Sequence, residues 1–410
     1  MVNKTLITAP TRSTHANEET VSRGTAAFRA IAICMTLAGL STFALMNCVQ
    51  PLMPFFAQGF AISAAQSSLS MSVNIGALAL CMPFASIISE RVGRKPVLVV
   101  SMFASGLACI TSATAQSWEA FLAYRALQGV LFAGVPAIAM AYIAEEISSS
   151  DTGYAAGLYV GGAAVGGLAG RVIAGLVAGH WGWQASIAVM GAVGVVSAAL
   201  FKHLLPPSRH FAAMPVDLRQ VVINYRRHLN NRNLLRAYLT AFMMMGSFVI
   251  ILNLIGFRLT EAPFSLGHRA ISALFLTSLA GIYASAFAGR MADRYGIVPV
   301  SRCALMCCAV GVLLMASASL PLVVIGLLMF TVGFFAAHCA ANGSVSRYAA
   351  FGKSQASTLY FISYYIGGAV LGWVGGVAWA YAAWPGVTAV LAMAVVVTFA
   401  LGFSNRRAVG

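Results

Sequence analysis

The sequence predicts an all-α membrane protein with twelve transmembrane helices in two pseudo-symmetric six-helix bundles. Three observations support this fold class. Of the 410 residues, 60% are hydrophobic and only 9% are charged, and the mean hydropathy is +0.84. Apolar stretches of about 20 residues recur along the chain, the length that a helix needs to cross a bilayer. Features of the first half also recur in the second half.

Twelve apolar stretches are long enough to span the hydrocarbon core. Helices are expected because lipid-facing backbone must be hydrogen-bonded within its own segment, and the alternating pattern of barrel strands is absent. The predicted spans are 29–53, 67–89, 96–115, 119–143, 153–179, 184–204, 235–257, 269–289, 298–318, 321–345, 355–380 and 384–404.

One long hydrophilic segment divides these spans into two groups of six. We predict an N-terminal bundle at 29–205, a cytoplasmic central loop at 206–234 and a C-terminal bundle at 235–404. Residues 1–28 are polar and lack the apolar core of a signal peptide, so we expect a disordered cytoplasmic tail there. A second, short cytoplasmic tail is expected at 405–410.

The net charge of +15 is distributed very unevenly. If the N-terminus is inside, 21 of the 25 Lys and Arg residues lie on the cytoplasmic side, and only Arg258 and Arg269 lie on the other side. The remaining two, Arg125 and Arg171, lie within spans. Because basic residues accumulate on the cytoplasmic side, we expect both termini in the cytoplasm and the chain in the inner (plasma) membrane. This pattern accounts for the charge without a nucleic-acid partner.

The eight cysteines all fall within predicted spans and behave as small hydrophobic residues. No CxxC motif or Cys/His cluster with ligand spacing is present. We therefore expect no metal site, and nothing in the sequence calls for a cofactor.

The two halves are related by an internal duplication. A shift of 201 residues aligns "GLYVGGAAVGG" at 157–167 with "TLYFISYYIGG" at 358–368, and Trp183 with Trp384. The turns after the second and eighth spans also match, in "SIISERVGRK" and "GRMADRYG". Each turn contains an acid, a base and then a glycine, which tolerates tight turns.

These turns resemble the signature loop of the major facilitator superfamily, G-x-x-x-D-R/K-x-G-R-K, although the first copy has Ser86 and Glu90 where Gly and Asp are usual. "RALQG" at 125–129 resembles the R-x-x-Q-G element of helix 4 in that family. "GFFAAH" at 333–338 and the paired tyrosines after Ser363 are similar to bacterial inner-membrane efflux carriers of the drug/proton antiporter and acriflavine-sensitivity type.

The resemblance implies alternating access, in which two bundles rock about a central site. It also implies that the two turns form conformational latches between the bundles. The latch residues are Glu90, Arg91, Gly93 and Arg94 in the first turn, and Asp293, Arg294 and Gly296 in the second.

Ionisable groups within the spans are candidates for function, because placing a charge in lipid is costly. Arg171 lies about 12 Å from the end of its span at ~1.5 Å per residue. Arg125 lies nearer a span end, where snorkelling to the surface is open to it, and His338 lies in the inner half of its span. None of the ten acidic residues falls in the middle of a span.

This charge pattern favours a neutral or anionic substrate over a cation, with Arg171 and Arg125 providing positive potential. His338 is the best candidate for carrying a coupling proton, because a histidine pKa of about 6.5 lies near physiological pH. Structural alternatives remain. Arg171 could instead lock its helix to carbonyls of the eighth span, Arg125 could be positional, and His338 could be a satisfied interior histidine.

Neutral polar residues complete the candidate substrate pocket. Pro51 and Pro54 break the outer end of the first span and free backbone carbonyls beside Asn47 and Gln50. The other candidates are Asn253, Asn342, Tyr360, Tyr364 and Tyr365, of which the last two cannot both face inward. Small residues allow close helix packing, which is the expected role of Gly162, Gly166, Gly167, Gly170 and Gly175.

The sequence therefore predicts a monomeric secondary transporter that binds a small-molecule substrate, uses protons and is surrounded by membrane lipids. Proton-coupled efflux of a neutral or anionic compound or drug is the first hypothesis, and proton-coupled import of a small metabolite is the alternative. An enzyme is disfavoured because no HExxH, G-x-S-x-G or clustered Asp/His motif is present. A channel is disfavoured because the chain has no repeated filter or charged ring.

Overall fold

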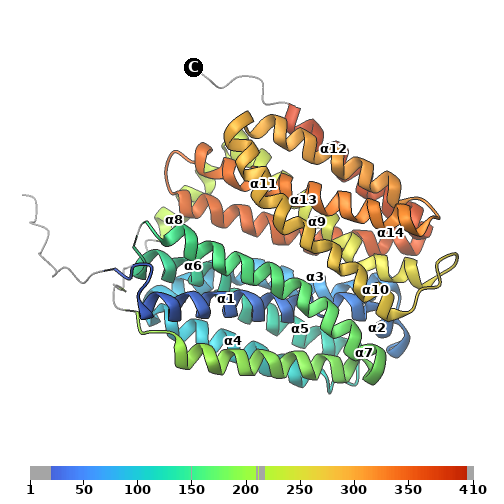
Figure 1. Ribbon diagram of the computed structural model, residues 1–410, viewed down its shortest axis with the longest axis horizontal. Helices are drawn as coiled ribbons and strands as arrows, with labels where there is room; N and C mark the ends of the chain where they lie inside the picture. Colours follow the sequence, from blue (N-terminus) through green and yellow to red (C-terminus); the bar gives the residue numbers. More distant parts are fainter. Residues whose placement is uncertain (1–19, 149, 209–210, 212–217, 404–410) are drawn as a thin grey trace, which may run out of the picture.

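The computed structural model describes residues 20–148, 150–208, 211 and 218–403, and these residues are mainly helical (Figure 1). The α-helices are α1 (Ala26–Asn47), α2 (Met53–Gly59), α3 (Ala64–Val92), α4 (Arg94–Ser112), α5 (Trp118–Phe132), α6 (Gly134–Glu146), α7 (Thr152–Leu204), α8 (Leu218–Leu229), α9 (Arg232–Thr260), α10 (His268–Leu274), α11 (Leu279–Tyr295), α12 (Ile297–Met315), α13 (Leu320–Tyr348) and α14 (Lys353–Phe403). Two 3-10 helices, η1 (Gln50–Leu52) and η2 (Phe275–Ser278), connect α1 to α2 and α10 to α11.

The described part of the chain contains ten helical stretches that are long and apolar enough to cross a membrane. Two of them, α7 with 53 residues and α14 with 51, are interrupted by non-helical backbone, at Gly182 and at Ala382–Ala383. Each therefore folds back on itself, as α7 does in Figure 1. Across the first turn, the Ser186 hydroxyl donates to the Ala174 carbonyl at 2.9 Å. Counted as separate arms, these helices give the twelve predicted spans.

The backbone repeats the duplication seen in the sequence. Gly182 has a φ of +81° and Ala383 a φ of +46°, and the two positions differ by the same 201 residues as the sequence repeat. The short turns between α3 and α4 and between α11 and α12 also match, because Gly93 and Gly296 have φ values of +103° and +88°. A residue with a side chain rarely adopts such angles.

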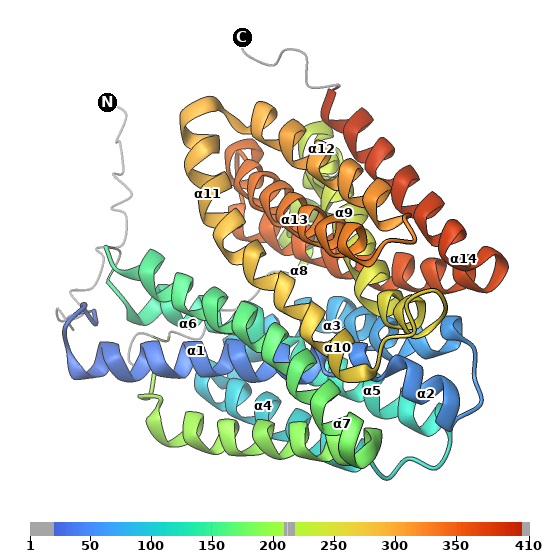
Figure 2. The same cartoon turned by 45° about the vertical axis from the view of Figure 1, so that its right-hand side comes forward.

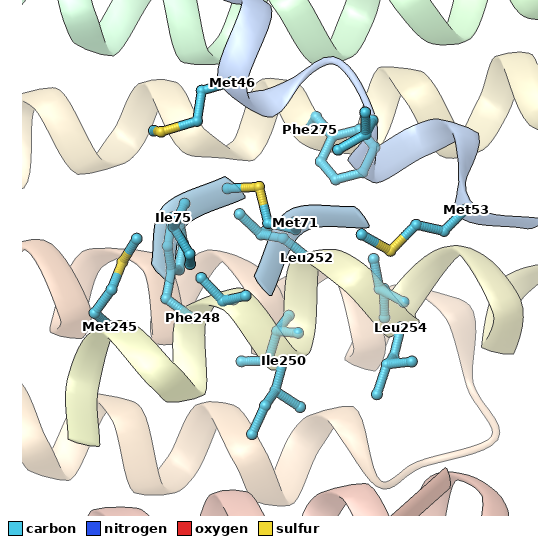
Figure 3. Packing of buried hydrophobic residues seen from close by; sticks show 14 of the residues in the cluster. Met46, Met53, Met71, Ile75, Met245, Phe248, Ile250, Leu252, Leu254 and Phe275 are labelled. Carbon is cyan, nitrogen blue, oxygen red and sulfur yellow. The ribbon is translucent and has the colours of Figure 1, made fainter. Parts of the chain in front are cut away.

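The two bundles are in contact at one end and have separate cores at the other. We call the end at which α1 begins and α14 ends the termini end, and the opposite end the far end. At the far end, residues of both halves share one hydrophobic core. Figure 3 shows Met46, Met71 and Ile75 packed beside Met245, Phe248 and Leu252.

Towards the termini end, each bundle has a hydrophobic core of its own. One cluster, which includes Phe28 and Tyr142, contains only residues of the first half. The other, which includes Tyr238 and Tyr360, contains only residues of the second half. Figure 2 shows the bundles converging towards α10 and diverging towards α6 and α11. The structure is therefore sealed at the far end.

The polar segments differ in part from the expected loop and tail. The segment 206–234 contains α8, which packs on the second bundle. The ring of His228 stacks on Phe351 at 4.6 Å, and Asn224 donates to Gln355 at 2.8 Å. Burial lowers the pKa of the His228 imidazole. Of the predicted tail, residues 1–19 lie outside the described residues, but α1 already begins at Ala26.

Ala383 provides a test of the duplication. Its φ of +46° and ψ of −140° are strained for a residue with a Cβ, at a cost of about 1–3 kcal/mol. We expect Ala383→Gly to stabilise the protein by about 1 kcal/mol, because glycine relieves the strain but loses about 0.5–1 kcal/mol in chain entropy. The measurement is unfolding of the purified protein in detergent. The control is Ala392→Gly, in a regular part of α14, which should destabilise the protein; a loss of stability in both variants would contradict the prediction.

Candidate functional site

Arg171 lies in the first arm of α7 and is only 7% exposed. Its guanidinium donates three hydrogen bonds to neutral oxygens. Nε donates to Gln50 Oε1 at 2.6 Å, one terminal nitrogen to Asn47 Oδ1 at 2.8 Å, and the other to the carbonyl of Gly167 at 2.9 Å. No carboxylate pairs with it among the described residues. Arg171 is thus a buried cation that is solvated by amides and carries an uncompensated charge.

The interrupted first span positions the two side-chain amides. α1 ends at Asn47, and η1 begins at Gln50, directly before Pro51. Proline cannot donate a backbone hydrogen bond, so the helix does not continue regularly. Both side chains are almost completely buried, at 5% and 2% exposure. The helix break expected at Pro51 is therefore present, with Asn47 and Gln50 on either side of it.

The same network joins the two bundles. Gln50 accepts from Arg171 through Oε1 and donates through Nε2 to Asn253 Oδ1 at 3.1 Å. Asn253 belongs to α9 and is 1% exposed, and its Nδ2 has no hydrogen-bond partner among the described atoms. Four predicted site residues, Asn47, Gln50, Arg171 and Asn253, thus form one chain of contacts, which crosses between the bundles at the sealed end.

The acceptors of Arg171 correct one structural alternative. A lock between Arg171 and carbonyls of the eighth span was an open possibility, but the three acceptors lie on α1, on η1 and on its own helix. That alternative is wrong in the described state, because none of these three acceptors belongs to the eighth span. The contact between α7 and α10 is made elsewhere. There Gly175 faces Ser272 so closely that an added Cβ would lie 1.9 Å from its hydroxyl.

Arg125 is a structural clamp inside the first bundle. It is 1% exposed, so the guanidinium turns inward and does not use the route to the surface that its position left open. Nε donates to the Ser70 carbonyl at 2.9 Å and a terminal nitrogen to the Met46 carbonyl at 3.0 Å. Gln128, one turn further along, accepts a third bond at 2.5 Å. Arg125 therefore ties α5 to α1 and α3 through backbone oxygens.

His338 lies in the second bundle beside two tyrosines. Its Nδ1 is 3.0 Å from the hydroxyl of Tyr360, and its ring lies 4.8 Å from the ring of Tyr364. Tyr364 is half-buried and lies within electrostatic range of Arg171 on the other bundle. Tyr365 is instead 3% exposed and packs in the shared hydrophobic core. Of the two adjacent tyrosines, Tyr364 is the candidate for the pocket wall.

The first signature turn is organised differently from the predicted latch. Arg94 forms a salt bridge at 2.7 Å with Glu145 of α6 and donates to the Ser89 hydroxyl at 2.6 Å. Its ion-pair partner therefore lies in the same bundle, and no ion pair between the bundles involves this turn among the described residues. Glu90 is half-buried and Arg91 is exposed.

In the second signature turn, the side chain of Asp293 lies outside the described residues. The guanidinium of Arg294 lies over the ring of Tyr295, with its carbon 5.2 Å from the ring centre. Gly93 and Gly296 both have positive φ and end α3 and α11. The two turns thus share their backbone geometry, while their described charged side chains make different contacts.

Three of the predicted packing glycines lie on one stripe of α7 against α1. A Cβ added at Gly162, Gly166 or Gly170 would lie 2.1–2.3 Å from a carbonyl oxygen of α1. Gly167 is different, since an added Cβ would meet the polar ends of Asn47 and Arg171 at ordinary contact distance. Its carbonyl accepts from Arg171, so Gly167 belongs to the polar network and not to the packing stripe.

Two structurally important charged residues were not singled out from the sequence. Glu145 lies just beyond a predicted span, and apart from its charge nothing in the sequence indicated its role. Arg258 lies at the far end of α9, where it donates to the carbonyls of Met315 and Ser317, each at 2.6 Å, and stacks on Trp384. It satisfies one carbonyl at the end of α12 and one just beyond it. This role could not be predicted without knowing which helix end lies nearby.

Helices arranged as two duplicated bundles, with a polar network between them, define a multi-pass transporter with a small-molecule substrate. A family model, the Major Facilitator Superfamily, matches residues 32–372. The chain belongs to this superfamily, and is a secondary transporter and not an enzyme.

Two bacterial relatives match almost the whole chain. The uncharacterized MFS-type transporter YybF of Bacillus subtilis is 36% identical over 389 residues, covering 95% of this chain and 96% of that protein. The inner membrane transport protein YnfM of Escherichia coli is 37% identical over 387 residues, covering 94% and 93%. The multidrug resistance protein MdtG of Escherichia fergusonii is 27% identical over 270 residues, covering 62% of this chain and 64% of that protein.

The same fold is present in a solved transporter structure. A bacterial homologue of the human lysosomal transporter Spinster, in an inward-facing and unoccupied conformation, superimposes with a TM-score of 0.76. The match covers 93% of this chain and 97% of that chain at 14% identity. At this identity the likeness supports the fold alone.

The contact between Gln50 and Asn253 can be tested by distance measurement. Asn253→Ala removes this bond across the bundles and leaves the Arg171 acceptors in place. Because one buried hydrogen bond contributes about 1 kcal/mol, we expect the population open at the far end to increase roughly fivefold. Spin labels at Ser63→Cys and Glu261→Cys, in a background without other cysteines, report the separation. Asn224→Ala, which removes an amide hydrogen bond within the second bundle, is the control, and an unchanged distance distribution in Asn253→Ala would refute the role of the bond.

Proposed function

We propose that this protein exports a neutral or anionic small organic compound across the inner membrane, driven by proton entry, with one chain sufficient for transport. The observation that carries the proposal is the guanidinium of Arg171. It is buried at the interface between the bundles and is held only by neutral oxygens of Asn47, Gln50 and Gly167.

The electrostatics of this group favour an anion or a polar acceptor as substrate. Amide and carbonyl oxygens solvate a guanidinium without cancelling its charge, and a charge in a low-dielectric region acts strongly on its neighbours. Arginine presents several donors in a planar fork that matches carboxylate and phosphate groups. The unpartnered Nδ2 of Asn253 adds a donor nearby. A cationic substrate would be repelled, since no carboxylate lies at the network among the described residues.

The aromatic group on the other bundle supplies a second part of the binding site. Tyr364 lies within electrostatic range of Arg171, and its ring contacts that of His338. A substrate held by Arg171 would therefore lie between the amides of the first bundle and the aromatic rings of the second. Contact with both bundles is what allows a substrate to bias their relative orientation.

Orientation and conformation fit an exporter in its loading state. The basic residues favour a cytoplasmic position for both termini, which makes the separated termini end the cytoplasmic end. The site would then face inward, where a substrate for export binds. The partial likeness to a multidrug resistance protein also supports export. Proton-coupled import uses the same site, and the direction of substrate movement in oriented proteoliposomes distinguishes the two.

The signature turns would act in the opposite conformation. In the described state the bundles are apart at the termini end, and Arg94 pairs with Glu145 within its own bundle. We propose that closing this end brings the turn at Glu90–Arg94 and the turn at Asp293–Gly296 to the opposing bundle. The charged residues then latch the outward-facing state.

Arg171 provides the first functional test. We expect Arg171→Gln to lower the transport efficiency for an anionic substrate roughly 10- to 150-fold, because a hydrogen bond to a charged group contributes about 1.5–3 kcal/mol. Arg171→Lys should recover only part of this loss, since lysine lacks the planar fork. The measurement is uptake into proteoliposomes, with the exposed Arg226→Gln as control. Strong preference for quaternary cations, unaffected by Arg171→Gln, would refute the proposed substrate class.

His338 provides the test of proton coupling. Histidine is the side chain best suited to bind and release a proton under physiological conditions, and the hydroxyl of Tyr360 lies 3.0 Å from Nδ1 of His338. We expect His338→Ala to abolish accumulation driven by a pH gradient while substrate exchange without a gradient continues. Tyr360→Phe keeps the imidazole and should retain most of the coupling. Full pH-driven transport by His338→Ala would exclude this residue as the proton carrier.

A further inference from the structure

Two adjoining depressions lie in the second bundle, away from the Arg171 network. The first is a small cavity of about 90 Å³ at the termini end, between α9, α12, α13 and α14. Its polar lining includes Asn233, Arg236, Ser301, Arg302 and Ser344. Two of its described lining residues are arginines and none is acidic. Such a cavity is too small for a drug-sized ligand, which needs about 300–1,000 Å³.

The second depression is an apolar groove of about 370 Å³ between α12 and the end of α14. All of its described lining residues are apolar, and they include Met306, Ala309 and Val396. Leu305 and Phe399 line both the cavity and the groove. The two spaces therefore adjoin, one lined partly by basic residues and the other by apolar residues only.

The order of these residues follows depth in the membrane. On α12, which begins at Ile297, Arg302 precedes Leu305 and Ala309, so the groove lies about 4–10 Å deeper than the arginine at ~1.5 Å per residue. On α14, which ends at the same side, the two linings overlap at Phe399, and the groove extends about one turn deeper, to Val395, than the cavity, which reaches Thr398. The charged residue thus lies nearer the membrane surface and the apolar side chains lie deeper, which matches the order of headgroup and acyl chains in a phospholipid of that leaflet.

We propose that this compound site binds one anionic glycerophospholipid of the leaflet at the termini end. The headgroup phosphate lies against Arg236 and Arg302, and one acyl chain lies in the groove between α12 and α14. Arginine is always charged and binds phosphate oxygens in a forked geometry. Basic pockets between transmembrane helices on the cytoplasmic side are suited to anionic headgroups. The site does not depend on the substrate or on the direction of transport.

The two arginines contribute differently. Arg236 is half-buried and donates to Asn233 Oδ1 at 3.5 Å, which orients its side chain on α9. Arg302 is exposed on α12. A lipid between them would join α9 and α12 to α14 through its phosphate and its chain, at the end where the second bundle must move relative to the first.

Native mass spectrometry of the full-length protein tests the proposal. We expect phosphatidylglycerol to bind at least tenfold more tightly than phosphatidylethanolamine. The double variant Arg236→Gln with Arg302→Gln should lower the affinity for phosphatidylglycerol roughly 30-fold, because each basic residue near an anionic headgroup adds about fivefold in affinity. The control, Arg226→Gln with Arg232→Gln, removes two exposed arginines of the same side that do not line the site, and should change binding less than twofold.

The acyl-chain compartment and the source of the phosphate are tested separately. Ala309→Phe fills the groove and should lower the affinity for phosphatidylglycerol. It should leave the binding of glycerol 3-phosphate, which has no acyl chain, unchanged. If the double arginine variant fails to fold, the single variant Arg302→Gln, at an exposed position, should still lower the affinity for phosphatidylglycerol about fivefold. Equal affinity for both lipids, no effect of the arginine variants, or displacement of the lipid by millimolar inorganic phosphate would overturn the proposal.

Discussion

The arrangement of the two bundles depends on how one buried cation is solvated. The charge of Arg171 cannot be left bare in a low-dielectric interior, because the cost is several kilocalories per mole. Amide oxygens of Asn47 and Gln50 meet that need, and they are available only because the first span is interrupted before Pro51. Gln50 then uses its remaining donor on Asn253. The solvation shell of the cation is therefore also a contact between the bundles, and movement of either bundle changes the environment of the charge.

The glycine stripe makes this solvation shell possible. At Gly162, Gly166 and Gly170 the backbone of α7 approaches α1 so closely that a methyl group would overlap a carbonyl oxygen. Small residues permit this approach, and it brings Arg171 within reach of the end of α1. Arg125 fixes the same end of α1 from the other side, through the carbonyl of Met46. Two arginines thus hold one helix end, but Arg125 donates mainly to backbone oxygens, whereas Arg171 donates mainly to side chains that can reorient.

The fold was predictable because its determinants are local. Span length, the positions of Pro51 and the turn glycines, and the 201-residue repeat are all read along the chain, and the structure agrees with them. The partners of charged groups were less predictable, because they depend on which helices are neighbours. Arg94 meets Glu145 across 51 residues, and Arg258 meets the end of α12 across more than 50. The helix within 218–229 was also missed, because its polar composition resembles that of a loop and its stability comes partly from packing of His228 on Phe351.

The two halves keep the same backbone but place different chemistry on it. At equivalent positions of the repeat, Gly166 and Gly367 both meet a carbonyl of a neighbouring helix at about 2 Å from an added Cβ, so the packing is shared. Arg171 lies in the first half, whereas His338, Tyr360 and Tyr364 lie in the second. Under the proposed function this asymmetry separates two tasks: the half with the fixed charge would attract the substrate, and the half with the histidine would bind protons. In that proposal, protonation of His338 would add a second positive charge beside Tyr364, which would strengthen the binding of an anionic substrate and weaken that of a cationic one.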